Sequence, residues 1–115
     1  MPNIIELAGR LRTSQKNVTV AAASGDLVAE NPFRATLTIC PPSSGYVTIS
    51  LLATAVLDQG IRVDSGDDPV VLTVGRDGDL PLRGWSVIHS VGADVVTVLE
   101  SVAPFSLRQP GSDYA

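Results

Sequence analysis

The stretch Asn31-Pro-Phe-Arg-Ala-Thr-Leu-Thr-Ile-Cys40 decides the fold. Asn31-Pro32 predicts a turn, because proline fixes its own φ and disfavours helical geometry in the residue before it. The residues that follow alternate, with Ala35, Leu37 and Ile39 on one face and Arg34, Thr36, Thr38 and Cys40 on the other. A period of two predicts a β-strand with one face on a core. Pro41-Pro42 ends this strand, since proline cannot donate a ladder hydrogen bond.

Outward from this strand, similar short segments recur between turns. Predicted strands cover residues 17–23, 46–52, 61–63, 70–74, 85–90 and 95–100, with a short return at 27–29. The segments 85–90 and 95–100 are typical of a hairpin joined by residues 91–94. Residues 70–74 are apolar on both faces, which predicts a strand covered on both sides. Residues 53–57 are apolar and fit no single element.

The composition favours the same fold class. The chain has 115 residues, of which 44% are hydrophobic and only 4% aromatic, and ten glycines and eight prolines interrupt it often. A core must therefore come from aliphatic side chains, many of them β-branched. About eight short strands between turns predict an all-β protein, an antiparallel β-sandwich or jelly roll. We expect an N-terminal arm (1–16), a sandwich domain (17–103) and a C-terminal tail (104–115).

Charge and apolar patterning argue against several classes of partner. A net charge of −4 is unsuited to a phosphate backbone or an anionic membrane surface. No apolar run approaches the roughly 20 residues of a membrane span, and the N-terminus lacks the apolar core of a signal peptide. We therefore expect a protein made in a cytoplasm that binds neither nucleic acid nor membrane.

Candidate chemistry is sparse. His89 is the single histidine, and no Gly-x-Ser-x-Gly elbow accompanies it, so a catalytic serine arrangement is not predicted. The acidic loop Asp64–Asp68 lacks the spacing and closing glutamate of a calcium loop and fits a solvated turn better, although ion binding there stays open. Cys40 is the single cysteine and is expected to pack as a small apolar residue. We expect no enzyme activity, metal or cofactor.

Two further side chains have structural interpretations. Trp85 is expected to be an anchor in the core or at an interface, because one tryptophan is too few for a typical sugar-binding platform. Arg34 begins a strand beside a proline turn and is predicted to pair with a carboxylate, for which Glu100 is a candidate.

Several blocks of the chain resemble a known family. Asn31-Pro32-Phe33-Arg34 with Leu37-Thr38-Ile39, then Gly45-Tyr46-Val47-Thr48-Ile49, Gly60-Ile61-Arg62-Val63 and Val96-Thr97-Val98-Leu99-Glu100 resemble the strands of small structural proteins of tailed bacteriophages. The resemblance covers residues 28–101. It departs from the family at Pro41-Pro42-Ser43-Ser44, where a polar Asn-Leu-Gly turn is usual, and the closing glutamate is displaced by one residue.

The resemblance implies a head decoration, or cement, protein. Such a protein would lie on the capsid exterior as a homotrimer, bind the major capsid protein and stabilise the head. The alternatives are another virion component (a head fibre base, a tail protein or a head-tail connector) and a carbohydrate-binding module. We expect shell contacts at Arg10, Arg12, Lys16, Phe105, Arg108 and Tyr114, and subunit contacts at Trp85, His89 and Val71.

Overall fold

A computed structural model describes residues 11–107 of the chain. Within that range eight strands account for most of the regular structure, and the two helical segments are single turns. The strands are β1 (Arg12–Val20), β2 (Gly25–Val28), β3 (Arg34–Ile39), β4 (Tyr46–Ser50), β5 (Ile61–Asp64), β6 (Val70–Thr73), β7 (Trp85–His89) and β8 (Asp94–Val102). The helical turns are α2 (Val74–Asp77) and the 3-10 segment η1 (Leu80–Leu82).

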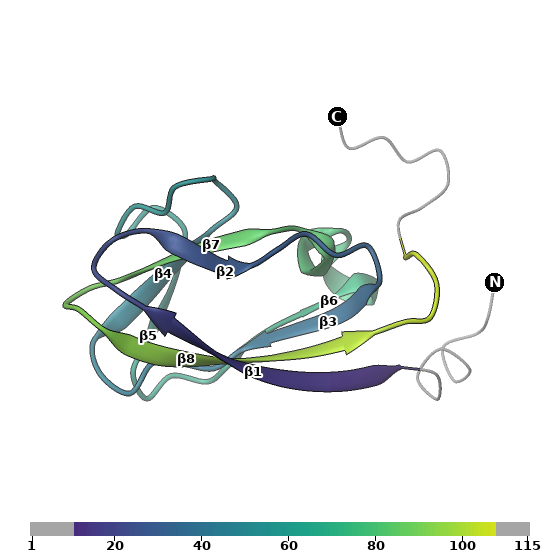
Figure 1. Cartoon of the computed structure of the whole chain (residues 1–115), viewed down its shortest axis with the longest axis horizontal. Helices are drawn as coiled ribbons and strands as arrows, with labels where there is room; N and C mark the ends of the chain where they lie inside the picture. The colour runs from purple at the N-terminus through teal and green to yellow at the C-terminus, as the bar shows by residue number, and fades with distance from the viewer. Residues whose placement is uncertain (1–10, 108–115) are drawn as a thin grey trace.

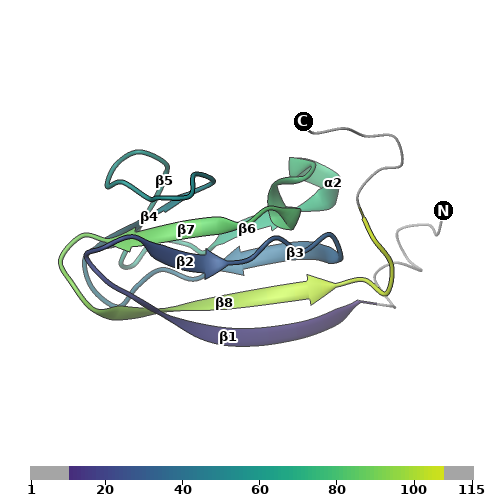
Figure 2. The ribbon, with the colours of Figure 1, turned by 45° about the horizontal axis from the view of Figure 1, so that its top comes forward.

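The strands pair as though one long hairpin had been rolled up. β1 pairs with β8, β2 with β7, β3 with β6 and β4 with β5, all antiparallel. Rolling the hairpin brings β3 beside β8 and β4 beside β7. The result is two four-stranded sheets, β1-β8-β3-β6 and β2-β7-β4-β5, which form two layers (Figures 1 and 2). This is the connectivity of a jelly roll, and it confirms the predicted antiparallel sandwich.

The core lies between the two sheets and is mainly aliphatic, as the composition predicts. Both sheets contribute, and Trp85 is the one aromatic side chain of the cluster. Burying a side chain of this kind contributes about 1.5–3 kcal/mol, so the interior of the sandwich dominates stability. The buried cluster comprises Val20, Leu27, Val28, Leu37, Ile39, Val47, Ile49, Val63, Leu72, Trp85, Val87, Val96 and Val98.

Strand β3 forms as its sequence predicts. The Asn31 side chain accepts a hydrogen bond from the Phe33 N–H (3.0 Å) and closes the turn before β3. Ala35, Leu37 and Ile39 are buried, whereas the threonines between them are half-buried. The pairing with β8 shifts by one residue at the start of β3, which marks a bulge at Ala35. Bulges redirect side chains, and Arg34, expected on the solvent face, is only 3% exposed.

The predicted hairpin of residues 85–100 is wrong. β7 and β8 belong to different sheets, so the turn between them crosses from one layer to the other. A crossing turn and a hairpin turn carry the same local signals of glycine and polar residues. The choice between them depends on which strands are neighbours, and that is a property of the whole fold.

Two other segments differ from their sequence predictions. β6 is an edge strand on which Val71 is 41% exposed, so residues 70–74 are not covered on both sides within one chain. β1 begins at Arg12 rather than near residue 17. The sequence does not indicate its first half as a strand, because those residues are exposed on both faces and show no apolar alternation. Residues 12–16 of the expected arm therefore belong to a sheet, and residues 1–10 and 108–115 lie outside the described range.

Candidate functional site

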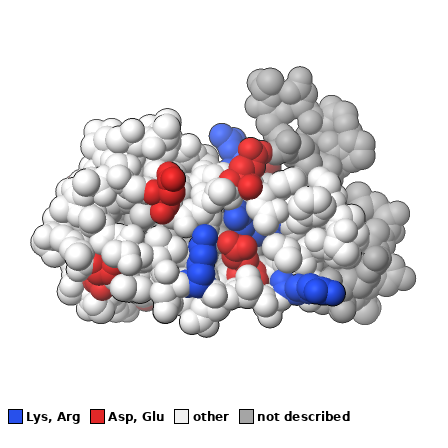
Figure 3. Space-filling view, viewed as in Figure 1, with Lys and Arg blue, Asp and Glu red and all other residues white. Residues whose placement is uncertain are grey.

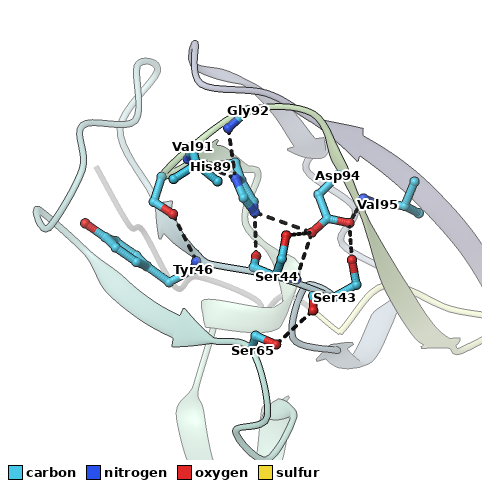
Figure 4. A network of polar contacts seen from close by, with 10 residues as sticks. Ser43, Ser44, Tyr46, Ser65, His89, Val91, Gly92, Asp94 and Val95 are labelled. Atoms are coloured by element: carbon cyan, nitrogen blue, oxygen red, sulfur yellow. Dashed lines mark hydrogen bonds and ion pairs between the residues drawn. The ribbon is translucent and has the colours of Figure 1, made fainter.

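A polar network centred on His89 and Asp94 connects two loops of the sandwich (Figure 4). The His89 ring is fully buried, and its Nε2 lies 2.8 Å from the Ser44 carbonyl oxygen and 3.4 Å from Asp94 Oδ2. Its Nδ1 accepts hydrogen bonds from the N–H groups of Val91 (3.1 Å) and Gly92 (3.2 Å). Because Nδ1 accepts, the proton of the neutral ring lies on Nε2, facing the two oxygens.

The Asp94 carboxylate is the acceptor at the centre of this network. It accepts from the Val95 N–H (2.7 Å), the Ser43 hydroxyl (2.8 Å) and the Ser44 N–H (3.1 Å). These bonds, the one from Val95 above all, lower the pKa of Asp94 from 3.8 to about 2. A carboxylate that accepts several hydrogen bonds holds its charge more firmly, so Asp94 stays ionised at neutral pH.

This geometry ties two loops together and does not resemble an acyl-transfer site. In a serine triad one ring nitrogen of the histidine faces the acid and the other faces the nucleophile. Here two backbone N–H groups occupy Nδ1, and the Ser43 hydroxyl bonds to the acid rather than to the ring. The network instead joins the β3–β4 connection to the β7–β8 connection.

Two residues expected at a subunit interface are buried in the interior of the folded protein. His89 is fully buried in the network, and Trp85 is 5% exposed in the core, where its indole N–H donates to the Leu80 carbonyl oxygen (3.1 Å). Their side chains are therefore not available to another subunit. Trp85, Val87 and His89 alternate along β7 and are all buried, so the face that they share is the core. Val71, the third expected interface residue, does lie on the surface.

The predicted pairing of Arg34 with Glu100 is present. Arg34 Nη2 lies 3.5 Å from Glu100 Oε1. The guanidinium also donates to the carbonyl oxygens of Ala29 (2.8 Å), Pro81 (3.0 Å) and Arg83 (3.3 Å). Burial lowers the pKa of Arg34, and the charge of Glu100 partly offsets that effect. The cluster joins the β2–β3 connection, the η1 region and β8, so it is a structural centre.

The acidic loop is organised by hydrogen bonds and one arginine. Asp67 accepts from the Asp64 N–H (3.0 Å), and Arg62 bridges Asp64 (2.7 Å) and Asp58 (3.3 Å) while its guanidinium stacks 3.6 Å from the centre of the Tyr46 ring. Among the described residues, no group of three or more His, Cys, Asp or Glu side chains has the geometry to hold a metal ion. Residues 65–69 are exposed, which fits the interpretation of a solvated turn.

The outer face of the β1-β8-β3-β6 sheet presents twelve side chains without a formal charge. Register and burial place six threonines on this face, together with Val71, Val95 and Leu99, and we call it the threonine face. A shallow hollow of about 450 Å³ lies over β1, β8 and β3. The twelve residues are Thr13, Gln15, Asn17, Thr19, Thr36, Thr38, Val71, Thr73, Val95, Thr97, Leu99 and Ser101.

The structure describes three of the six residues expected to contact a shell. Arg12 and Lys16 lie on the exposed edge strand β1, and Phe105 is half-buried after β8. Arg10, Arg108 and Tyr114 fall outside the described residues. Cys40 is half-buried and has a free thiol. Two exposed surfaces were not predicted from the sequence, namely the threonine face and the β4–β5 connection. The alternation of residues in β3 and β8 is a signal that could have identified the threonine face.

Comparisons with known proteins yield little. No protein-family model matches the chain, and no curated protein is similar to it. A solved structure of a Bacillus endospore appendage, described as one of a novel family of disulfide-linked pili, is similar at a TM-score of 0.46 and 12% identity. That likeness covers 81% of this chain and 86% of the other. The helices of the described region are too short to cross a membrane.

Proposed function

We propose that this chain is a non-catalytic structural protein of a tailed-phage virion that decorates the head. In this proposal it assembles as a homotrimer on the capsid exterior and binds the major capsid protein. The threonine face is the observation that carries the proposal. Interface cores are depleted in charged residues, and this face has none although the chain as a whole has a net charge of −4.

The centre of the threonine face has the chemistry of a subunit contact. Leu99 pairs with Thr38 in the sheet, and Thr38 pairs with Val71, so two exposed aliphatic side chains flank one threonine. Leu99 is 38% exposed and Val71 is 41% exposed. Contact between copies would cover both side chains and the outer face of edge strand β6, which one chain leaves open.

The experiment is to measure oligomer mass by light scattering and capsid occupancy for the wild type and the double variant V71K/L99K. We expect a wild-type trimer that fills phage heads lacking the protein, and a monomeric double variant that binds them poorly. V91K is the matched control, because Val91 is 75% exposed on a separate turn. A wild type that is monomeric and leaves heads empty contradicts the proposal. A ring of six or more subunits would instead favour a tail or connector component.

The carbohydrate-binding alternative would have to do without Trp85 as an aromatic platform. Trp85 is buried, and the hollow on the threonine face is lined by Glu100 and by residues with hydroxyl, amide or aliphatic side chains. Sugar rings usually stack on exposed aromatic faces, and this hollow offers none. A glycan array probed with the wild type and with L99K tests whether the hollow binds sugars despite that.

A further inference from the structure

The β4–β5 connection displays aliphatic side chains to solvent. Residues 51–57, Leu-Leu-Ala-Thr-Ala-Val-Leu, contain no charged residue, and we call them the aliphatic loop. Leu52 is 65% exposed, Val56 is 45% exposed and Leu51 is 38% exposed. The loop projects from the sandwich above β4 in Figures 1 and 2. Apolar side chains grouped on a surface are typical of binding sites, whereas single scattered ones are not.

Hydroxyl groups of the sandwich hold the backbone of this loop. The Ser86 hydroxyl donates to the Leu52 carbonyl oxygen (2.7 Å), and the Ser50 hydroxyl oxygen accepts from the Leu52 N–H (3.0 Å). The Ser24 hydroxyl oxygen accepts from the Ala55 N–H (2.7 Å), and the Ala55 side chain is buried. The loop is thus fixed from β4, from β7 and from the β1–β2 connection.

The end of the loop is fixed as well. The Thr48 hydroxyl oxygen accepts from the Asp58 N–H (3.1 Å), and the Gln59 N–H donates to the Val56 carbonyl oxygen (3.1 Å). Gly60 lies so close to β4 that a Cβ atom there would collide with the Ile49 carbonyl oxygen. A surface loop held at this many points presents Leu52 and Val56 in one arrangement, which reduces the entropy lost on binding.

Acidic side chains flank the aliphatic loop. Asp58 follows it directly, and Asp26 pairs in the sheet with Ser86, whose hydroxyl holds the loop. Asp58 is paired with Arg62, whereas Asp26 has no ion-pair partner among residues 11–107. Figure 3 shows the upper left of the molecule as mainly uncharged, with an acidic group beside the uncharged area. A complementary partner would therefore offer an apolar pocket with lysine or arginine at its rim.

We propose that the aliphatic loop seats the protein in an apolar, basic-rimmed pocket of the major capsid protein, an inference that rests on the proposed function. Three aliphatic side chains cover far less than the about 800 Å² per partner of a stable interface. One such contact is weak, but three contacts in a trimer on a regular lattice act together. A lipid surface fits less well, because residues 51–57 contain neither a cationic nor an aromatic residue, and Arg62 beside the end of the loop is paired with Asp58 and Asp64.

The test compares the occupancy of phage heads lacking the protein by the wild type, L52D and V91D. L52D places a charge on the most exposed of the three aliphatic side chains, and V91D places the same charge on another exposed aliphatic residue. Circular dichroism and a thermal melt check that each variant folds. We expect L52D to need at least a ten-fold higher concentration for half-occupancy and V91D to stay within two-fold of wild type. We also expect D26K to weaken binding most at low salt.

Three outcomes would overturn the inference, and they differ from one another. Equal occupancy by the wild type and L52D removes the loop from the contact but leaves the proposed function standing. Equal losses in L52D and V91D show that any added charge weakens binding. Wild-type protein that floats with phosphatidylcholine vesicles, while L52D does not, assigns the loop to a lipid surface. Failure of the wild type itself to bind heads contradicts the proposed function instead.

Discussion

Arg34 and Glu100 form an ion pair between β3 and β8, with Nη2 and Oε1 3.5 Å apart. The arginine side chain is 3% exposed and the glutamate side chain 15% exposed, so the pair is largely shielded from water. Three backbone carbonyl oxygens complete the guanidinium's contacts, whereas its Nε has no partner. The attraction between the two charges therefore contributes less to stability than it costs to remove one partner and leave the other charge buried and unpaired.

Replacing Arg34 by alanine should destabilise the protein strongly. The variant leaves the Glu100 carboxylate without its counter-charge and three carbonyl oxygens without a donor, which costs about 3–5 kcal/mol. Urea unfolding followed by tryptophan fluorescence measures the change. R62A is the control, because the ion pairs of Arg62 are exposed to solvent and their loss should change stability far less. Equal losses in the two variants would mean that burial of Arg34 does not set its contribution.

The pKa of Asp94 predicts a stability change in acid. Its pKa is about 2 in the folded protein and 3.8 as an ordinary value, so its ionised form stabilises the fold. That contribution is present above about pH 4 and is lost as pH falls through about 2. Since the carboxylate lies near the surface, we expect roughly 1–2 kcal/mol. Urea midpoints between pH 2 and 5 should fall less steeply for D94N than for wild type, and equal slopes would contradict the prediction.

Gly60 should tolerate no side chain. In G60A the added Cβ meets the Ile49 carbonyl oxygen, which belongs to the β4 backbone and cannot move freely. We expect a loss of about 1–3 kcal/mol, comparable with overpacking of a core. Thermal unfolding measures it, and G25A is the control because nothing lies within 4 Å of a Cβ at that position. A wild-type melting temperature for G60A would show that the loop end can shift without cost.

The aliphatic loop should contribute little to stability. Leu37 is fully buried and L37A should cost about 2–5 kcal/mol. Leu52 is 65% exposed, and L52A should change the free energy of unfolding by no more than about 0.5 kcal/mol. Parallel urea titrations of the two variants compare the positions. A large loss in L52A would mean that the side chain supports the fold and is not free for a partner.

Local patterns determined much of the fold. Alternation in β3 predicted its buried face, and the Asn31-Pro32 turn and the Arg34–Glu100 pair were both identified from the sequence. These features depend on neighbouring residues, or on two strands that each show one clear face. The family resemblance and the functions drawn from it remain predictions.

The tertiary structure alone decided which strands are neighbours and which surfaces stay open. Rolling the hairpin separated β7 from β8, buried His89 and Trp85, and left the threonine face and the aliphatic loop exposed. An alternating pattern indicates that a strand has two different faces, but it does not indicate what covers each face. Coverage depends on contacts between residues far apart in the chain, and the amino-acid sequence lists those residues without pairing them.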